Sequence, residues 1–433
     1  MAGVIVSGYA HHVTMRRCWS LPDLFRNMSD YYGPRFHTMR FGPFLVLCAT
    51  GLLAIFSSTI SKSPVLPFFA RQLGADPSAI GFIAAVSAFA GVAFSVPAGI
   101  LADRFGKKRL IIVAAIIFAT APFGYLLVGN TWQLAAVRLY HGCATAIFVP
   151  VAMAMVSGLS QKERGEKLGW FSTATLAGRF MAPIIGGGIL AFFTLDSSTG
   201  YTAVYLVCGG AGLVAFVLAW TVPVPEKKEQ TIQSWSETFG EFRTVILDRN
   251  ILVTCVVEAA ILFAYGTFET FLPLYAVTSG LTAAHVGILL SGQIIVLALS
   301  KPIMGRFSDI HGRKPQIFAG GLLGAACIAG FSITTSFLPL LCLSTAFGLC
   351  LSVVTSATSA YIADLSSPET RGSAMGMLGS IMDIGHTAGP LVSGAVASLF
   401  GYAQSFVGAA LVLLAVSLIF IFKIGLSAEK QVS

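Results

Sequence analysis

The sequence predicts an all-α polytopic membrane protein with twelve transmembrane helices in two parallel, pseudo-symmetric six-helix halves. Three observations predict this fold. Hydrophobic residues make up 55% of the 433 residues and charged residues only 11%, whereas soluble domains carry about 25% charged residues. Long apolar runs recur along the chain, each near the ~20 residues that cross a bilayer as a helix. The second half of the sequence also repeats the first.

The apolar runs define the predicted spans and the parts of the chain between them. The spans are 43–68, 79–101, 109–128, 132–157, 168–193, 201–222, 251–276, 285–305, 316–335, 338–362, 374–399 and 402–424. The first run is too long for the apolar region of a cleavable signal peptide. The predicted parts are a cytoplasmic tail (1–42), a six-helix half (43–222), a cytoplasmic linker (223–250), a second six-helix half (251–424) and a cytoplasmic tail (425–433).

The basic residues predict the orientation in the membrane. Of the 27 Lys and Arg residues, only Arg71 lies in a predicted outer loop; Lys62, Arg138, Arg179 and Lys301 lie inside spans, and the other 22 lie in predicted inner loops and tails or, as Arg109 and Lys423 do, at the inner end of a span. An excess of Lys and Arg marks the cytoplasmic side. Both termini are therefore expected in the cytoplasm, with the protein in a plasma or inner membrane. Scattered loop charges without an aromatic platform argue against nucleic-acid binding.

A charged phrase occurs twice, as GILADRFGKKR and as GRFSDIHGRKP. Its aspartates, Asp103 and Asp309, are 309 − 103 = 206 residues apart. The segments 64–74 and 270–280 match at the same offset. An even number of spans per repeat gives parallel halves, related by a pseudo-two-fold axis along the membrane normal. Substrate sites in such folds lie near the midplane, between the halves.

These phrases resemble a known family. The Gly-x-x-x-Asp-Arg-x-Gly-Lys-Lys phrase after span 2, with its degenerate copy after span 8, resembles the signature of the major facilitator superfamily, and the resemblance covers almost all of the chain after the tail. The Gly/Pro phrase of span 5 resembles the antiporter motif of twelve-span drug–proton exporters, with Ala182 where that motif has Gly. A phrase in span 4 is similar to the family's Arg-x-x-Gln-Gly, with His141 in place of Gln.

We expect the two charged phrases to act as conformational latches in short inner loops. A glycine allows the turn, an aspartate can cap free N–H groups of a nearby helix, and the basic residues can bind carboxylates of neighbouring helices while the inner ends are closed. A simple membrane anchor is the alternative. The latch residues are Gly99, Asp103, Arg104, Gly106, Lys107 and Lys108 in the first copy, and Gly305, Asp309, Gly312, Arg313 and Lys314 in the second.

The Gly/Pro phrases of spans 5 and 11 are expected to form helix-packing hinges. Small residues let helix backbones approach closely in lipid, and proline removes one hydrogen bond of the helix. Ordinary small-residue packing is the alternative. The hinge residues are Gly169, Gly178, Pro183, Gly186 and Gly187 in span 5, and Gly385, Gly389 and Pro390 in span 11.

Charged residues inside spans are costly in hydrocarbon, so we expect them to face protein or a wet cavity. The predicted substrate and proton pathway contains Lys62, Arg138, His141 and Arg179 from the first half, and Glu258, Tyr265, Glu269, Asp383 and His386 from the second. The repeat places Glu269 one residue from the position equivalent to Lys62, so both should lie at similar depth across the cavity. Glu258 lies nearer the inner end, where water is expected to reach it.

The charges have two interpretations. They form ion pairs between the halves that exchange as the halves move, or a carboxylate takes and releases a coupling proton, with Glu269 the first candidate and Asp383 the second. A permanently satisfied pair is the structural alternative. The abundance of Phe (33) and Met (11) suits an adaptable apolar pocket.

The resulting functional prediction is a secondary active transporter working by alternating access, with proton-coupled efflux of small apolar or amphipathic compounds. Its partners would be the substrate, protons and the bilayer, and a monomer is expected. No catalytic pair, metal-ligand spacing or phosphate-binding loop is found, so we expect no enzyme, metal or cofactor. One alternative is a uniporter or proton symporter for an organic anion or other small metabolite, bound by Lys62, Arg138 and Arg179. Another is a transport-inactive membrane sensor or lipid-handling protein.

Overall fold

The computed structural model describes residues 42–159, 163–193, 195, 198–222, 248–367 and 370–425, apart from the side chains of Val96, Ile100 and Asp103. The chain divides into two units at Gly42, and all helices below belong to the second, Pro43–Ser433. The predicted tails over 1–42 and 425–433 and the predicted linker over 223–250 lie almost entirely outside the described residues.

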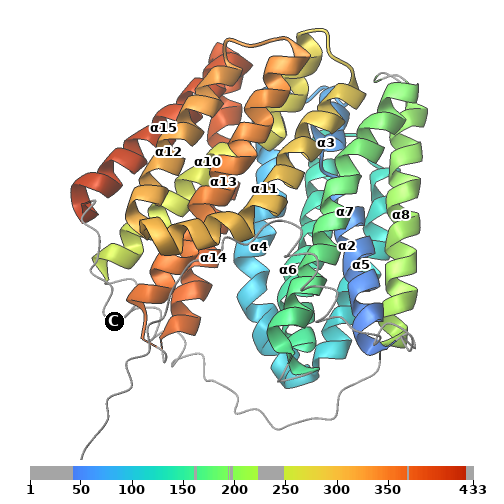
Figure 1. Cartoon of the computed structure of the whole chain (residues 1–433). Helices are drawn as coiled ribbons and strands as arrows, with labels where there is room; N and C mark the ends of the chain where they lie inside the picture. Colours follow the sequence, from blue (N-terminus) through green and yellow to red (C-terminus); the bar gives the residue numbers. More distant parts are fainter. Residues whose placement is uncertain are drawn as a thin grey trace, which may run out of the picture. The chain divides into compact units, whose positions relative to one another are not determined.

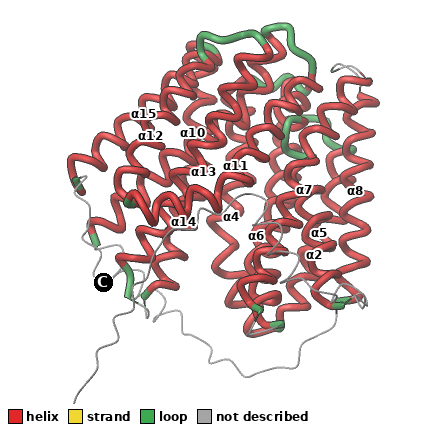
Figure 2. The backbone as a smooth tube through the Cα atoms, in the orientation of Figure 1, coloured by secondary structure: helices red, strands yellow, loops and turns green. Residues whose placement is uncertain are grey.

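The described part of the second unit is all-helical (Figures 1 and 2). Its first half contains α2 (Pro43–Ile60), α3 (Val65–Gln72), α4 (Pro77–Phe105), α5 (Lys107–Tyr125), α6 (Thr131–Gly158), α7 (Arg164–Phe193) and α8 (Ser198–Thr221). Its second half contains α10 (Arg249–Thr278), α11 (Ala283–His311), α12 (Arg313–Phe331), α13 (Phe337–Leu365), α14 (Arg371–Phe400) and α15 (Tyr402–Ile424). Because α2 and α3 together form one span, these helices make the twelve crossings that the sequence predicts.

Ten of these crossings are long and apolar enough to span a membrane by length and composition alone. The other two are α12 and α14. Helix α12 begins with Arg313 and Lys314, and α14 carries Asp383 and His386 near its middle. Both are equivalent by the repeat to helices of the first half, α5 and α7, that do meet the criterion. Polar side chains thus lower the hydropathy of two helices without removing them from the bundle.

The first crossing is interrupted, whereas the sequence predicted one continuous helix over 43–68. Helix α2 ends at Ile60 and α3 begins at Val65. Pro64 lies in the interruption and explains it, because proline has no N–H to donate and disfavours helical backbone in the residue before it. The interruption also contains Lys62.

The charged phrases form turns of one residue, so the short inner connections that the sequence predicts are shorter still than the bounds of the predicted spans imply. Helix α4 continues to Phe105 and α11 continues to His311. Only Gly106 (φ 95°) and Gly312 (φ 92°) leave the helical conformation, and a positive φ is readily adopted only by glycine. One such residue is enough to reverse the chain, so the helices extend beyond their apolar spans. We call this end of the bundle the Gly106 end.

The two halves meet through two equivalent helix pairs, α4 with α14 and α7 with α11. Four glycines make these contacts close: a Cβ added to any of them would meet a backbone oxygen of the other half. These residues, which we call the seam glycines, are Gly81 (against Pro390), Gly394 (against Pro77), Gly187 (against Ala283) and Gly287 (against Pro183). All four lie in the parts of their helices remote from the Gly106 end.

The surroundings of the glycines differ at the Gly106 end. A Cβ added to Gly99, Gly305 or Gly372 would meet no atom within 4 Å. In Figure 1 the lower ends of α6 and α14 diverge from one another. Among the described residues, the close glycine contacts between the halves therefore gather at the end opposite Gly106.

Candidate functional site

Lys62, Glu269 and His386 form a cluster that joins the two halves, and we call it the central cluster. The Lys62 ammonium donates to Glu269 Oε2 at 2.6 Å. His386 Nε2 lies 3.2 Å from the same oxygen and 3.5 Å from Lys62 Nζ. The structure thus places Lys62 against Glu269, as the repeat predicts.

The local structure explains how these side chains reach one another. Lys62 projects from the interruption between α2 and α3, Glu269 comes from α10 and His386 from α14. The carboxylate is well buried, with its side chain 10% exposed. The ring of Tyr265, one turn before Glu269, lies 5.4 Å from the His386 ring. One carboxylate therefore accepts from a lysine of the first half and contacts a histidine of the second.

A second polar group lies entirely within the first half. Arg138 is 2% exposed; its guanidinium donates to Tyr125 (3.0 Å), Ser61 (3.3 Å) and Ser87 (2.8 Å). His141 is also buried, with Nδ1 3.3 Å from the Ser61 hydroxyl. Hydroxyl groups, rather than carboxylates, are the hydrogen-bond partners of Arg138 in the described structure. The network approaches the central cluster only through Ser61, the residue before its lysine.

Arg179 is placed differently from the other two predicted cations of the first half. It lies on α7 and its side chain is exposed. It is within electrostatic range of Lys62, Tyr265 and His386. Within the described ranges it makes no hydrogen bond or ion pair. Arg179 therefore faces the central cluster without joining it.

The structure does not bring Asp383 into the central cluster, although it lies one turn from His386. Its carboxylate packs against α4, where a Cβ added to Gly91 would lie 3.0 Å from Asp383 Oδ2. No ion pair of Asp383 is found in the described part of the chain. Asp383 thus faces the other half of the molecule at a separate point.

Glu258 is fully buried, and the expectation that water reaches it is wrong. It is 0% exposed, and one of its carboxyl oxygens is in a short hydrogen bond with the Thr358 hydroxyl. The other oxygen has no hydrogen-bond partner among the described residues. Helices α13 and α14 pack on α10, and these tertiary neighbours, which the position of a residue along its helix does not reveal, cover the side chain.

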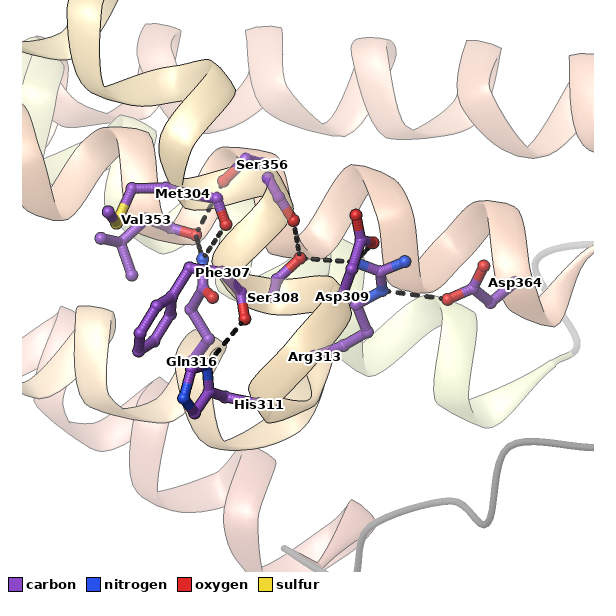
Figure 3. A network of polar contacts seen from close by, with 11 residues as sticks. Met304, Phe307, Ser308, Asp309, His311, Arg313, Gln316, Val353, Ser356 and Asp364 are labelled. Atoms are coloured by element: carbon purple, nitrogen blue, oxygen red, sulfur yellow. Dashed lines mark hydrogen bonds and ion pairs between the residues drawn. The ribbon is translucent and has the colours of Figure 1, made fainter. Parts of the chain in front are cut away.

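The second charged turn contains a polar network, shown in Figure 3. Arg313 forms an ion pair with Asp309 and donates from Nε to Asp364 Oδ2 at 3.1 Å. Its Nη1 donates to the Ser308 hydroxyl at 2.5 Å. These contacts join α11, α12 and α13. The basic side chain therefore binds carboxylates, but the helices that it connects belong to one half.

The first charged turn has weaker contacts. Lys107 Nζ lies 3.5 Å from the backbone oxygen of Ala154, and Arg104 lies 5.5 Å from the ring of its neighbour Phe105. The Asp103 side chain lies outside the described residues, so its predicted capping role is not addressed by the structure.

The remaining predicted latch residues make few contacts. Gly99 and Gly305 have open space beside them. In the described structure Lys108 has no ion pair. The Lys314 ammonium lies 5.7 Å from the ring of Tyr361.

The predicted hinge glycines pack helices within each half. A Cβ added to Gly178 would meet the backbone oxygen of Leu52, and one added to Gly385 would meet that of Ala259. These contacts, α7 on α2 and α14 on α10, are equivalent by the repeat. Gly169 differs, because it has open space beside it.

The other hinge residues extend the same packing. A Cβ added to Gly389 would meet the backbone oxygen of Phe263, and one added to Gly186 would lie 3.2 Å from Ile60 Cγ1. Pro183 and Pro390 present their carbonyl oxygens to seam glycines of the other half. Helices α7 and α14 thus use one set of small residues toward their own half and another toward the opposite half.

The comparison with known families decides the assignment. The family model described as Major Facilitator Superfamily matches residues 46–291 and 256–432. The chain belongs to the Major Facilitator Superfamily. It is therefore a membrane transporter rather than an enzyme.

Several superfamily members are similar to this chain along most of their length. An uncharacterized MFS-type transporter of Methanocaldococcus jannaschii is 25% identical over 349 residues, which cover 79% of this chain and 88% of the relative. The multi-drug resistance efflux pump PmrA of Streptococcus pneumoniae is 27% identical over 351 residues, which cover 78% and 85%. A crystal structure of a mutant of the nucleoside transporter NupG has a TM-score of 0.74 at 17% identity, covering 88% of this chain and all of that one; this likeness shows the superfamily fold.

The contacts that the seam glycines and Asp364 make were not predicted from the sequence. Gly81 and Gly287 are 206 residues apart, and Gly187 and Gly394 are 207 apart, so the repeat offset could have identified the seam glycines as equivalent pairs. No such signal existed for Asp364. Its equivalent position, 364 − 206 = 158, holds a glycine.

Proposed function

We propose that this superfamily member exports small apolar or amphipathic compounds in exchange for protons, by alternating access. The central cluster carries the proposal, because it places one ionisable carboxylate between a lysine of the first half and a histidine of the second. The similarity to a multi-drug resistance efflux pump supports export as the direction.

The exchange would depend on the charge of Glu269. While it is ionised, Glu269 accepts from Lys62 at 2.6 Å and holds the two halves together at this level. A proton on the carboxylate removes the negative charge that the ammonium binds, so the link between the halves breaks. Release of the proton restores it. The arrangement of the halves and the occupancy of the proton site are thereby linked.

Alternating access is supported by the difference between the two ends of the bundle. The seam glycines pack the halves backbone to backbone at one end, whereas Gly99, Gly305 and Gly372 at the Gly106 end have open space beside them. With the charged turns on the cytoplasmic side, as the basic residues predict, this arrangement corresponds to a form open toward the cytoplasm. Rocking of the halves would separate the seam glycines and bring the charged turns together.

The charged turns would serve this motion in two ways. The contacts of Arg313 hold α11, α12 and α13 as one unit during rocking. Contacts between the halves at the Gly106 end, the predicted latch, would form only in the opposite state. The proposal is completed by a monomer in the plasma or inner membrane, driven by the proton gradient without a cofactor.

The test is proton movement in inside-out vesicles with a pH gradient, followed with a pH-sensitive dye. Lipophilic cations, neutral aromatic compounds and amphipathic anions would be added in turn. We expect some of these compounds to trigger proton release with the wild-type protein, and Glu269→Gln to reduce that release about 100-fold or more, the usual scale for loss of a proton-transferring group, while compounds still bind. Glu166→Gln, which changes an exposed glutamate of α7, is the matched control.

The outcomes separate the candidates. Unchanged pH dependence in Glu269→Gln would show that Glu269 does not carry the proton, and loss in Asp383→Asn instead would assign the role to Asp383. If none of the added compounds triggers proton release with the wild-type protein, the proposed exchange is refuted.

A further inference from the structure

We propose that Arg179 is an anion-binding residue of the transport pathway, and that the exported compounds include amphipathic molecules with an acidic group. The inference rests on the proposed function and supplies its substrate class. The anion recognition that the sequence suggested for three cations is thereby assigned to one of them.

Arg179 lies on the face of α7 opposite to the face exposed to lipid. The exposed, large apolar side chains of α7 share one face, as expected for a surface in lipid. They are Trp170, Met181, Ile184 and Phe192. At about 3.6 residues per turn, Arg179 lies on the opposite face, with the buried Pro183, Gly186 and Leu190. This face points between α2 and α11, the helices that α7 packs against most extensively. Arg179 is therefore exposed toward the interior of the bundle and not toward lipid.

Among the residues that the structure describes, the Arg179 guanidinium has no counter-ion. Lys62 is bound to Glu269, and Arg138 is buried among three hydroxyl groups. The other acid of this region, Asp383, packs against α4. An arginine stays protonated in proteins, and a charge within a membrane span is costly unless water or a partner compensates it. Among the predicted cations of the first half, Arg179 alone is both exposed and unpaired in the described structure.

The surroundings indicate the kind of ligand. Ser172 and Thr175 lie on the same face of α7, toward the Gly106 end, with Leu176 beside them. The partly buried Tyr265 is within electrostatic range across the bundle. A planar guanidinium binds carboxylate, sulfonate or phosphate groups through paired hydrogen bonds, and the aromatic and aliphatic neighbours suit an apolar body. A lipophilic cation would gain nothing from this charge.

The experiment compares two probes with the same aromatic skeleton, the anion 1-anilinonaphthalene-8-sulfonate and the neutral N-phenyl-1-naphthylamine. Their fluorescence is titrated with the full-length protein in lipid nanodiscs, with empty nanodiscs as background. We expect Arg179→Gln to weaken binding of the anion by at least about tenfold, the scale of one charge-assisted hydrogen bond, and to leave binding of the neutral probe within about twofold. Arg179→Lys, which keeps the positive charge but not the paired hydrogen bonds, should retain part of the preference for the anion. Arg249→Gln, at an exposed position of α10, is the matched control.

Retained neutral-probe binding shows that a variant is folded. If Arg179→Gln binds neither probe, the Arg179→Lys variant decides. A preference of Arg179→Lys for the anion supports the inference. Loss of that preference, while Arg179→Lys still binds the neutral probe, overturns it. Anion binding that is insensitive to Arg179, or equally reduced in the control, also overturns it.

The same probes in the vesicle assay separate this inference from the proposed function. Binding of the anion that depends on Arg179, with no proton release by either probe, would uphold the anion site and refute proton-coupled export. Proton release by the neutral probe, with no binding or transport of the anion, would uphold export and overturn the anion site.

Discussion

The two charged turns of the repeat share a backbone conformation and differ in their contacts. Gly106 and Gly312 reverse the chain with nearly the same φ, 95° and 92°. After the second turn, Arg313 binds two carboxylates. After the first, Lys107, at the equivalent position, lies 3.5 Å from the backbone oxygen of Ala154 and forms no ion pair with the side chains that the structure describes, which do not include that of Asp103.

The same division holds elsewhere in the molecule. Glycines that pack helices occur in both halves, as Gly178 and Gly385 show. The ion pair of the central cluster has no such counterpart: the position of Glu269 holds Ser63 in the first half, since 269 − 206 = 63. Features that determine the path of the backbone are therefore common to both halves, whereas Lys62 and Glu269, on which the proposed function depends, each lack an equivalent in the other half.

The largest expected effects test the shared packing. Gly178→Ala and Gly385→Ala should each destabilise the protein by about 1–3 kcal/mol, because the added Cβ meets backbone that cannot move aside easily. Gly169→Ala, with open space beside it, should have the opposite sign and stabilise by up to about 1 kcal/mol through helix propensity. Melting temperatures of the purified variants provide the measurement. If either Gly178→Ala or Gly385→Ala melts at the wild-type Tm, the two glycines do not have equivalent packing roles in the two halves.

Intermediate effects are expected at the helix N-termini, where Asp76 and Thr282 cap α4 and α11 from equivalent positions. Asp76→Ala and Thr282→Ala should each cost about 1 kcal/mol. Asp76→Ala should cost more, since Asp76 Oδ2 also accepts from Ser398 of the other half at 3.2 Å. Thermal melting checks this: Ser398→Ala should lower the Tm of the wild-type protein but not that of the Asp76→Ala variant. An equal loss of Tm in the wild type and in Asp76→Ala would show that the hydrogen bond between Ser398 and Asp76 contributes nothing.

The smallest effects concern the charged turns themselves. Asp364→Asn should lower stability by up to about 1 kcal/mol, because the Asp364 side chain is 52% exposed and exposed ion pairs are weak. Gly158→Asp, which introduces a carboxylate at the equivalent position near Lys107, should raise it by a similar or smaller amount. Both differences in stability from the wild type should become smaller as salt is added, because salt screens exposed charges. Melting curves at low and high salt measure this, and an unchanged Tm for Asp364→Asn at low salt would contradict the role of the Arg313 contacts.

Much of the fold could be predicted because two strong signals agreed. Apolar runs of membrane-spanning length located the helices, and the repeat related the halves. The repeat also placed Lys62 opposite Glu269, since equivalent residues of symmetric helices lie at equal depth.

The remaining features depend on tertiary neighbours. The burial of Glu258 follows from helices α13 and α14, and one of the two carboxylates that bind Arg313 comes from Asp364, which has no counterpart in the repeat. The side-chain exposure of Arg179 depends on the rotation of α7 about its axis. The interruption of the first crossing did have a local signal, Pro64 inside a predicted span, and it was overlooked because hydropathy alone does not register the missing N–H.

That interruption makes the two halves unlike as building blocks. Helix α10 runs without a break through the equivalent positions, 267–270. A chain assembled from two first halves would contain two broken crossings and two lysines facing serines. A chain assembled from two second halves would contain two facing glutamates and no lysine at the position of Lys62, which is Phe268 in the second half. The duplicated parts have thus become complementary, like the two different subunits of a heterodimer joined in one chain.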